Sequence, residues 1–182
     1  MKTVGQKIEP FRITGVKPGF NLPDENGASA FLDVTEASFA GKWKIIYFYP
    51  KAFTFVCPTE IVAYNKLVRD FEDRDTVLLG GSLDNEFVAL AWRRDHKDLD
   101  RLAHYQFADP AGQLVDQLGI RDAANGVPLR ATFIVDPENV IQHVTVNNLD
   151  VGRNAEEALR VLDALQTGEL CACNRTVGGT TL

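Results

Sequence analysis

The chain has 182 residues, of which 45% are hydrophobic and 24% are charged, and its net charge is −6 at pH 7. This length and apolar content suit a single soluble globular domain over residues 1–182. Acidic and basic residues are interspersed, so no basic patch favours nucleic acid, and no apolar run approaches the roughly 20 residues of a membrane span. Because no apolar signal segment follows the first residues, the chain is expected in the cytoplasm.

The sequence predicts an alternation of strands and helices. After an irregular N-terminal third, residues 43–49 are almost continuously apolar, β-branched or aromatic, as in a buried strand. Apolar residues at helical spacing predict a helix after Cys57. The further elements, in chain order, are a strand at 76–80, a helix from about Asn85 with Phe87, Leu90 and Ala91 on one face, a strand near 105–108, a helix near 114–118, strands at 132–135 and about 140–146, and a final helix.

The final helix has the clearest predicted ends. Asn154 is its expected N-cap, with Glu157 three residues later, and Gly168 lies just past its end, where a tail at 167–182 begins. Strands that alternate with helices predict an α/β fold with a central sheet covered by helices on both faces. Residues 136–139 have turn chemistry, so the last two strands should form a hairpin and the sheet should be mixed.

Cys57 lies at the junction between the predicted strand and helix. Pro58 suits the first helical position, which would make Cys57 the N-cap, and Glu60 stands three residues on, as in a capping box. The N–H groups and the dipole of a first turn favour an anion, so a thiol at this position is expected to ionise readily. The alternative is a buried, inert cysteine.

Three cysteines are too few, and odd in number, for a secreted disulfide framework, so transient catalytic thiol chemistry fits better. Metal binding is the competing interpretation, because Cys171-x-Cys173 is a close thiolate pair and histidines at 96, 104 and 143 could add ligands. Structural zinc sites need four ligands and usually a longer spacer between paired cysteines. Neither a metal nor another cofactor is therefore expected.

The segment Pro50-x-x-x-Thr54-x-x-Cys57 resembles the active-site signature of the peroxiredoxins. Residues 53–60 are similar to the typical two-cysteine branch, which includes the peroxidase component of bacterial alkyl hydroperoxide reductase. Segments at 130–136, 151–154 and 169–171 stand in the family's order, so the resemblance covers essentially the whole chain. It implies a thioredoxin-like fold and an enzyme that reduces hydrogen peroxide and organic hydroperoxides at the expense of a thiol.

The resemblance also implies roles for five residues. Cys57 would attack the peroxide and become a sulfenic acid, which Cys171 of another copy would resolve by forming a disulfide between the two chains. Arg130 and Thr54 would stabilise the thiolate and the peroxide oxygens, and Pro50 would shield the thiolate from water. The residues alone leave other interpretations open: a surface arginine, a threonine that caps the segment locally, and a proline that merely ends the strand.

Three more residues have weaker claims to the site. Glu60 could pair with Arg130, but its capping-box position is already a sufficient structural role. Trp92 fits a packing residue as well as it fits a residue that shapes the site, and it is left out of the site. Cys173 is either a bystander or a third catalytic thiol that relays the disulfide outward, as thiol–disulfide exchange allows.

The partners implied are hydroperoxide substrates, a thiol reductant protein and further copies of the chain. The run at 169–173 resembles an actinobacterial type, some members of which are recycled by an unrelated D-type thiol reductase; a thioredoxin-like protein and a flavoprotein are the other options. Homodimers should assemble into larger rings. A redox-dependent holdase chaperone or disulfide relay is the alternative function, whereas a thioredoxin-type reductase is disfavoured because Cys57 lacks a Cys-x-x-Cys partner.

Overall fold

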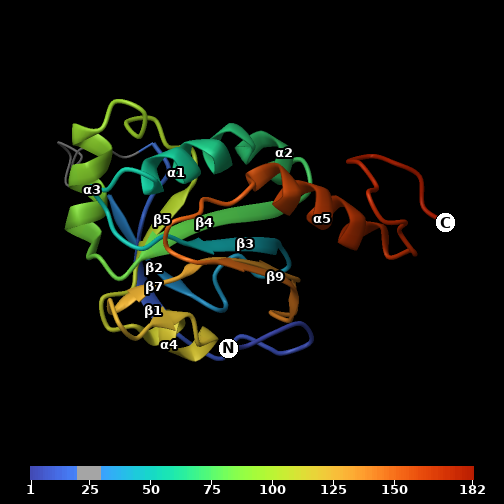
Figure 1. Cartoon of the computed structure of the whole chain (residues 1–182), viewed down its shortest axis with the longest axis horizontal. Coiled ribbons are helices and arrows are strands. Elements are labelled where there is room, and N and C mark those ends of the chain that lie inside the picture. Colours follow the sequence, from blue (N-terminus) through green and yellow to red (C-terminus); the bar gives the residue numbers. More distant parts are fainter. Residues whose placement is uncertain (20–29) are drawn as a thin grey trace.

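A large mixed sheet organises the chain in the computed structural model, which describes residues 1–19 and 30–182 (Figure 1). The strands are β1 (Arg12–Val16), β2 (Phe31–Thr35), β3 (Trp43–Phe48), β4 (Thr76–Ser82), β5 (Tyr105–Ala108), β6 (Arg121–Asp122), β7 (Val127–Pro128), β8 (Arg130–Val135) and β9 (Ile141–Asn147). The helices are α1 (Cys57–Lys66), α2 (Val68–Glu72), α3 (Glu86–Asp95), α4 (Gln113–Leu118) and α5 (Ala155–Thr167).

Within the described residues the large sheet has seven strands in the order β2-β1-β5-β4-β3-β8-β9. The central strands β3, β4 and β5 are parallel, whereas β1 and β8 run antiparallel to their central neighbours. The hairpins β1–β2 and β8–β9 form the two outer edges. The predicted mixed sheet and the predicted C-terminal hairpin are both confirmed.

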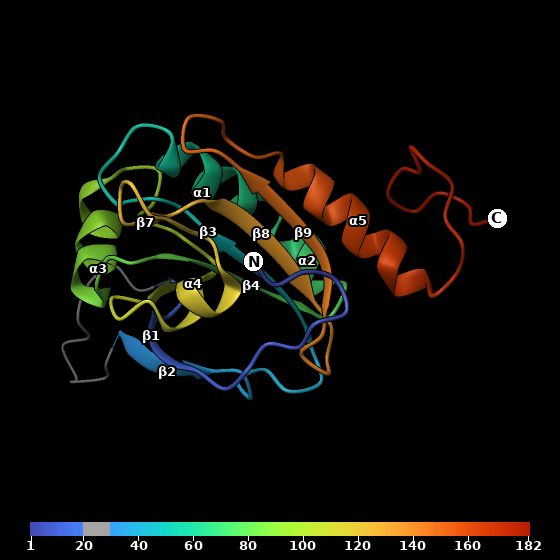
Figure 2. The same cartoon turned by 60° about the horizontal axis from the view of Figure 1, so that its bottom comes forward.

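Helices cover both faces of this sheet, as the sequence predicts (Figures 1 and 2). On one face α1, α2 and α5 pack over β3, with Ile45, Ile61, Phe71 and Leu162 in the shared core. On the other face α4 and the N-terminal segment cover a second apolar cluster that contains Phe133. Burial on both faces explains why the β3 sequence is apolar at every position except Lys44.

Two glycines in β4 let aromatic rings lie against the middle of the sheet. A Cβ atom on Gly80 would overlap the ring of Tyr47, and one on Gly81 would overlap the ring of Phe107. Tyr47 stacks in turn on Tyr64 of α1, with ring centroids 4.2 Å apart. The absent side chain at Gly80 therefore makes room for the pair of rings on which α1 rests.

Three predictions about the elements are wrong. The N-terminal third contains β1 and β2; residues 20–29 of that stretch lie outside the described residues. The helix after Cys57 is two helices, because the backbone leaves the helical conformation at Leu67 (φ −98°, ψ 6°). In α3 Leu90 is buried as predicted, but Phe87 is 64% exposed and Ala91 only partly buried, and the buried face carries Ala89 and Trp92 beside Leu90.

The ends of α5 are confirmed. The side chain of Asn154 accepts a hydrogen bond from the backbone N–H of Glu156, and Gly168 ends the helix in the left-handed conformation (φ 67°). Glu157 does not complete a capping box, because its carboxylate pairs with Arg160 at 2.6 Å. None of the helices in residues 1–19 and 30–182 combines the length and the apolar character that crossing a bilayer would take.

Candidate active site

Cys57 is the first residue of α1, not its N-cap as the sequence predicts. The N-cap is Val56, whose backbone carbonyl accepts hydrogen bonds from the N–H groups of Thr59 (3.1 Å) and Glu60 (3.4 Å). Pro58 occupies the second helical position, where its missing N–H costs no hydrogen bond, so the helix begins one residue earlier than expected. Cys57 is a free thiol and only 1% exposed, in the first turn of a helix.

Arg130 brings a buried cation to the sulfur. It is the first residue of β8, and its Nη1 lies 3.5 Å from Cys57 Sγ and 2.5 Å from Glu60 Oε2. Its Nε donates to the carbonyl of Leu149 at 2.8 Å. Because the side chain is only 5% exposed, its interpretation as a surface arginine is wrong.

Glu60 is held between two arginines. Its Oε2 accepts from Arg130, and its Oε1 accepts from both the backbone N–H (3.0 Å) and the Nε (2.8 Å) of Arg153. The Glu60 and Arg153 side chains are each 2% exposed. The expected ion pair with Arg130 is confirmed, while the predicted capping box is wrong because both carboxylate oxygens face the arginines. A carboxylate this well bonded fixes both guanidinium groups in place.

Arg153 is the site residue that the sequence analysis missed. Its Nη1 donates to the carbonyl of Ala131 (2.5 Å) and to the hydroxyl of Thr132 (3.2 Å). Its guanidinium carbon lies 5.6 Å from the centre of the Tyr47 ring and 5.9 Å from that of Tyr64, within range of a cation–π interaction. The only available signal was its place in the segment at 151–154 that stands in the family's order.

The charges of this cluster support one another. Burial alone would lower the pKa of Arg130, but its hydrogen bond to Cys57 and the charge of Glu60 outweigh that cost and raise it. Burial raises the pKa of the Tyr47 and Tyr64 phenols, so both rings remain neutral beside the arginines. Two guanidinium groups and one carboxylate therefore leave the cluster with a net positive charge beside the sulfur, to which the neutral phenols add nothing.

The segment that leads into Cys57 is pinned to the scaffold beside it. The backbone N–H of Ala52 donates to the Asp84 carboxylate at 2.7 Å, and Phe53 takes a positive φ of 56°. The Thr54 hydroxyl donates to the backbone carbonyl of Lys51 at 3.0 Å, which is the local capping role that the sequence left open. Pro50, half-buried, directly follows the buried residue Tyr49.

Trp92 is a packing residue, in agreement with its exclusion from the site. It is 1% exposed, and its ring contacts those of Tyr49 and Phe53, with centroids 5.8 Å away in each case. Trp92 thus belongs to the core and packs against Phe53 of the segment before Cys57.

The other two cysteines lie in the tail after α5, which projects from the body of the molecule (Figure 1). Cys171 is partly buried, and its sulfur lies 3.6 Å from the Thr167 hydroxyl; Cys173 is exposed. Asp163 of α5 anchors the tail: it accepts hydrogen bonds from Arg175 (2.6 Å) and from the N–H of Gly178 (2.9 Å). The structure therefore does not bring Cys171 and Cys57 together within one chain.

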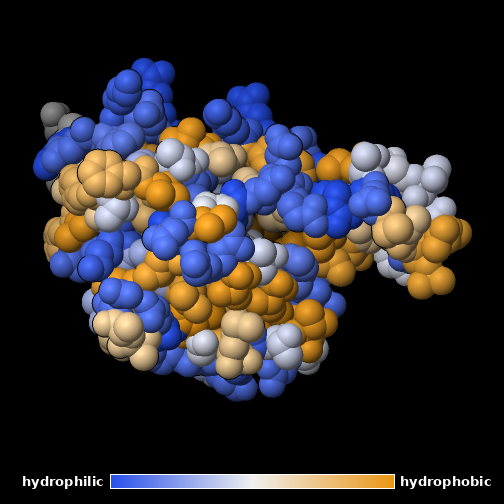
Figure 3. All heavy atoms as spheres, in the orientation of Figure 1, coloured by the Kyte–Doolittle hydropathy of each residue, from blue (hydrophilic) through white to orange (hydrophobic). Residues whose placement is uncertain are grey.

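The tail is also anchored to α2 and carries exposed apolar side chains. Arg74, just after α2, donates to Asp163 at 3.0 Å, so one carboxylate ties three segments together. Leu170 and Leu182 in the tail are 77% and 83% exposed, and apolar atoms gather at the end of the projection in Figure 3. Such side chains are candidates for contact with another protein.

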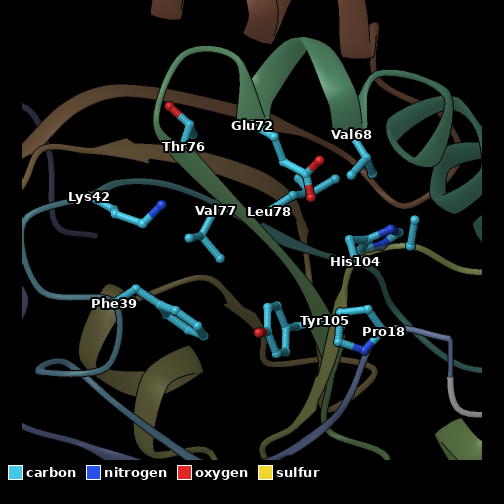
Figure 4. Close-up of a pocket in the computed structure, with 11 residues that line it drawn as sticks. Pro18, Phe39, Lys42, Val68, Glu72, Thr76, Val77, Leu78, His104 and Tyr105 are labelled. Carbon is cyan, nitrogen blue, oxygen red and sulfur yellow. The ribbon is translucent and has the colours of Figure 1, made fainter.

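A separate pocket of about 310 Å³ lies at the opposite end of the parallel strands (Figure 4). Phe39, Val77 and Tyr105 form its apolar walls, with Lys42 and Glu72 at the polar side. No cysteine is among its lining residues. In the part of the chain that the structure describes, no group of three or more His, Cys, Asp or Glu side chains is arranged to hold a metal ion.

Comparison with known proteins agrees with this geometry. Residues 13–144 match the model of the AhpC/TSA family. The chain is 48% identical to alkyl hydroperoxide reductase C of Mycolicibacterium smegmatis, over 99% of this chain and 93% of that protein, and 44% identical to the Mycobacterium tuberculosis protein of the same name, over the same shares of the two chains.

Solved structures give the same result. Mycobacterium tuberculosis AhpC superposes with a TM-score of 0.87 at 43% identity, covering 96% of this chain and 98% of that chain. Enterococcus faecalis AhpC superposes with a TM-score of 0.83 at 33% identity, covering 92% of this chain and 94% of that chain. These likenesses confirm the thioredoxin-like fold and do not favour the holdase alternative. The chain therefore belongs to the AhpC/TSA family and is a peroxiredoxin, a thiol-dependent peroxidase.

Proposed function

We propose that Cys57 is the residue that attacks the peroxide. The observation that carries this assignment is its buried sulfur at the start of α1, 3.5 Å from Nη1 of Arg130. Attack of the thiolate on a hydroperoxide ROOH forms an S–O bond and breaks the O–O bond. The leaving oxygen takes a proton and departs as ROH, and Cys57 becomes a sulfenic acid.

Arg130 stabilises the charge that moves during this step. Its guanidinium faces the sulfur and presents donors in a fixed orientation, so it favours the thiolate before attack and the negative charge on the departing oxygen during attack. Glu60 and Arg153 act as positioning residues, because they hold Arg130 without contacting the sulfur. Their rigid arrangement avoids a reorganisation cost at the moment of reaction.

Thr54 and Pro50 complete the proposed site from the segment before the helix. Thr54 is half-buried, three residues before Cys57, and a hydroxyl that donates to Lys51 still has lone pairs to accept a hydrogen bond from the peroxide. Pro50 has no N–H and offers an apolar surface, which limits the access of water to the thiolate.

Cys171 is the proposed resolving cysteine. Its thiol attacks the sulfenic sulfur of Cys57 in a second chain, forming the disulfide and releasing water. The position of the tail supports a bridge between two chains, because the tail projects away from the body and both cysteines are free within one chain. Cys173 is exposed, which suits a thiol that exchanges with the bridge and passes it to a reductant protein.

We also propose that the chain forms homodimers that assemble into rings. The strand β9 is an edge strand of the described sheet; its first residue, Ile141, bonds to the N-terminal segment, and the edge beyond it can pair with a second copy. Around the site Phe53, Phe55 and Phe87 are 56%, 94% and 64% exposed, which suits a further contact between dimers. The cytoplasmic location, the thiol reductant partner and the tail at 167–182 as a separate arm stay predictions.

The test is peroxide consumption by the purified protein with dithiothreitol as reductant. Cys57→Ser should abolish turnover while the fold stays intact, because an alcohol is a far poorer nucleophile than a thiolate. Residual activity above about a tenth of the wild-type rate would contradict the assignment. Cys173→Ser is the matched control, since dithiothreitol can reduce the Cys57–Cys171 bridge directly.

The resolving step has its own test. Peroxide treatment should give a disulfide-linked dimer on non-reducing gels, and Cys171→Ser should leave Cys57 as a sulfenic or sulfinic acid unless Cys173 substitutes for it. Light scattering of the reduced and oxidised protein would measure the mass of the assembly in each state. A monomer in both states, or a bridge within a single chain, would disprove the assembly while leaving the peroxide chemistry intact.

A further inference from the structure

A second, smaller pocket lies directly behind the arginine cluster, between β9 and α5. Its volume is about 140 Å³, enough for several water molecules or one small ion. Thr132 of β8, Thr145 and Asn147 of β9, and Arg153 contribute polar side chains to its wall. Both cartoons show α5 alongside β9 (Figures 1 and 2). Cys57 is not among the residues that line this pocket, but Arg153 links the pocket to the sulfur through Glu60 and Arg130.

One donor atom of Arg153, a residue in the wall of this pocket, has no hydrogen-bond partner among the described residues. The Nε of its guanidinium is used by Glu60, and its Nη1 by the Ala131 carbonyl and the Thr132 hydroxyl. The Nη2 atom is buried and has no hydrogen-bond partner among the described residues. The side chain is 2% exposed, so an unmet donor at this depth is costly and calls for an acceptor in the pocket.

The surroundings favour an anionic acceptor. The 13-residue helix α5 begins at the pocket, and its N-terminus adds a partial positive charge. The one carboxylate in the wall is Glu157, whose side chain is 45% exposed and already paired with Arg160. His143 is neutral because burial lowers its pKa, and its Nε2 shares a hydrogen bond with the Thr145 hydroxyl at 2.7 Å.

The charge of the buried cluster depends on the state of Cys57. Arg130 and Arg153 carry two positive charges and Glu60 carries one negative charge. The thiolate form of Cys57 balances the cluster, whereas a neutral thiol, a sulfenic acid or a disulfide leaves one positive charge without a counterion. Water in the pocket could satisfy the Nη2 donor but could not neutralise that charge.

We propose that the pocket between β9 and α5 binds a small inorganic anion on Nη2 of Arg153, and that this anion competes electrostatically with the Cys57 thiolate. The competition rests on the proposed role of Cys57, while the binding site does not. Because linkage is reciprocal, the anion should disfavour the thiolate, and forms with a neutral residue 57 should bind the anion more tightly. Anions would thus retain the enzyme in its resting or oxidised forms.

Binding is tested first on Cys57→Ser, in which residue 57 never carries a charge and peroxidase activity plays no part. Calorimetric titration with sulfate, inorganic phosphate, bicarbonate and chloride should show saturable binding of at least one of them in the millimolar range. Arg153→Lys retains the charge but removes Nη2, and Thr145→Val removes a hydroxyl of the wall. Both should weaken binding, the first at least about tenfold.

Arg94→Lys is the matched control, since Arg94 is exposed on α3 and pairs with its neighbour Asp95. It should bind as the parent does. Absence of saturable binding by all four anions would mean that the pocket holds water only, and the proposal would be wrong. Equal binding by the Arg153→Lys and control proteins would place the anion elsewhere and would also overturn the proposal. If Arg153→Lys does not fold, the binding measured with Thr145→Val tests the site in its place, and binding equal to that of the control would overturn the proposal.

The competition is tested in a protein that retains Cys57 but carries serine at 171 and 173. A saturating anion should move the thiolate titration of Cys57 to higher pH by about half a unit, a threefold loss of thiolate below the midpoint. Single-turnover attack on peroxide should slow in proportion. Binding without any change in that titration would disprove the coupling, while failure of Cys57 to react at all would disprove only the proposed peroxidase role.

Discussion

Replacing Glu60 by glutamine should destabilise the protein far more than one surface ion pair could. The carboxylate accepts three hydrogen bonds, and both arginines that it neutralises are almost fully buried. Glutamine has a single acceptor oxygen, so an amide that still serves Arg153 must point its NH₂ group at Nη1 of Arg130. Breaking a buried ion pair by removing one partner costs about 3–5 kcal/mol.

The assays are guanidinium chloride unfolding and thermal unfolding of the reduced protein at one fixed concentration, because assembly makes apparent stability depend on concentration. At about 2–4 °C per kcal/mol for a chain of this size, the melting temperature should fall by roughly 6–20 °C. Glu9→Gln is the matched control: Glu9 pairs with Lys2 at 3.1 Å but is 67% exposed, so its loss should be below about 1 kcal/mol.

The same variant has a second, opposite readout. With the carboxylate gone, two positive charges remain near the sulfur, so the thiolate of Cys57 should form at lower pH in whatever fraction of Glu60→Gln stays folded. A stability loss no larger than that of Glu9→Gln would refute the reasoning, because it would mean that the two guanidinium groups find water or another partner. An unchanged thiolate titration would show that the cluster does not act on the sulfur.

Three other perturbations probe the site, the core and the tail. Arg130→Ala should slow attack on peroxide at least about tenfold and move the Cys57 thiolate titration to higher pH; an unchanged single-turnover rate would remove Arg130 from the chemistry. Burial lowers the pKa of His104 from 6.5 to about 3. Between these values the unfolded chain binds a proton at His104 and the folded chain does not, so the stability of the fold is full above pH 6.5 and falls as the pH drops below it. Between pH 7 and 5 this should cost about 2 kcal/mol, so the loss of stability over that range in denaturant titrations should be smaller by about that amount in His104→Gln, and an equal loss in both proteins would contradict the assignment. Asp163→Asn should release the tail, so trypsin should cut after Arg175 sooner than in the wild type, and equal cleavage rates would show that other contacts anchor the tail.

Those elements whose signal is local could be predicted from the sequence. The strand β3 is buried on both faces and therefore almost continuously apolar, and Asn154 and Gly168 mark the ends of α5 by their own chemistry. The strands β1 and β2 have only five residues each, and their pairing depends on partners distant in the sequence. Tertiary contacts rather than propensity create such strands, so no local pattern marked them.

The site residues likewise divide into those that a local sequence signal marks and those that only distant contacts bring together. Cys57 was predictable because the strand–helix junction and the proline after it are contiguous in the sequence. The ion pairs of Glu60 join residues 70 and 93 positions apart, so periodicity cannot reveal them. Arg130 was expected only through the family resemblance, and Arg153 was missed because, apart from its place in the family-like segment at 151–154, nothing near it marks a buried arginine.

The glycine at residue 80 sets the thickness of the layer between the sheet and the active-site helix. Tyr47 lies over Gly80, Tyr64 lies on Tyr47, and Cys57 stands on the same helix as Tyr64, two turns earlier. A single methyl group at residue 80 would displace the first ring, then the second, then α1, while the strand carrying Arg130 is held separately by its pairing with β3 and β9. A substitution at residue 80 would thus change the distance between the Cys57 sulfur and the Arg130 guanidinium, although residue 80 contacts neither group.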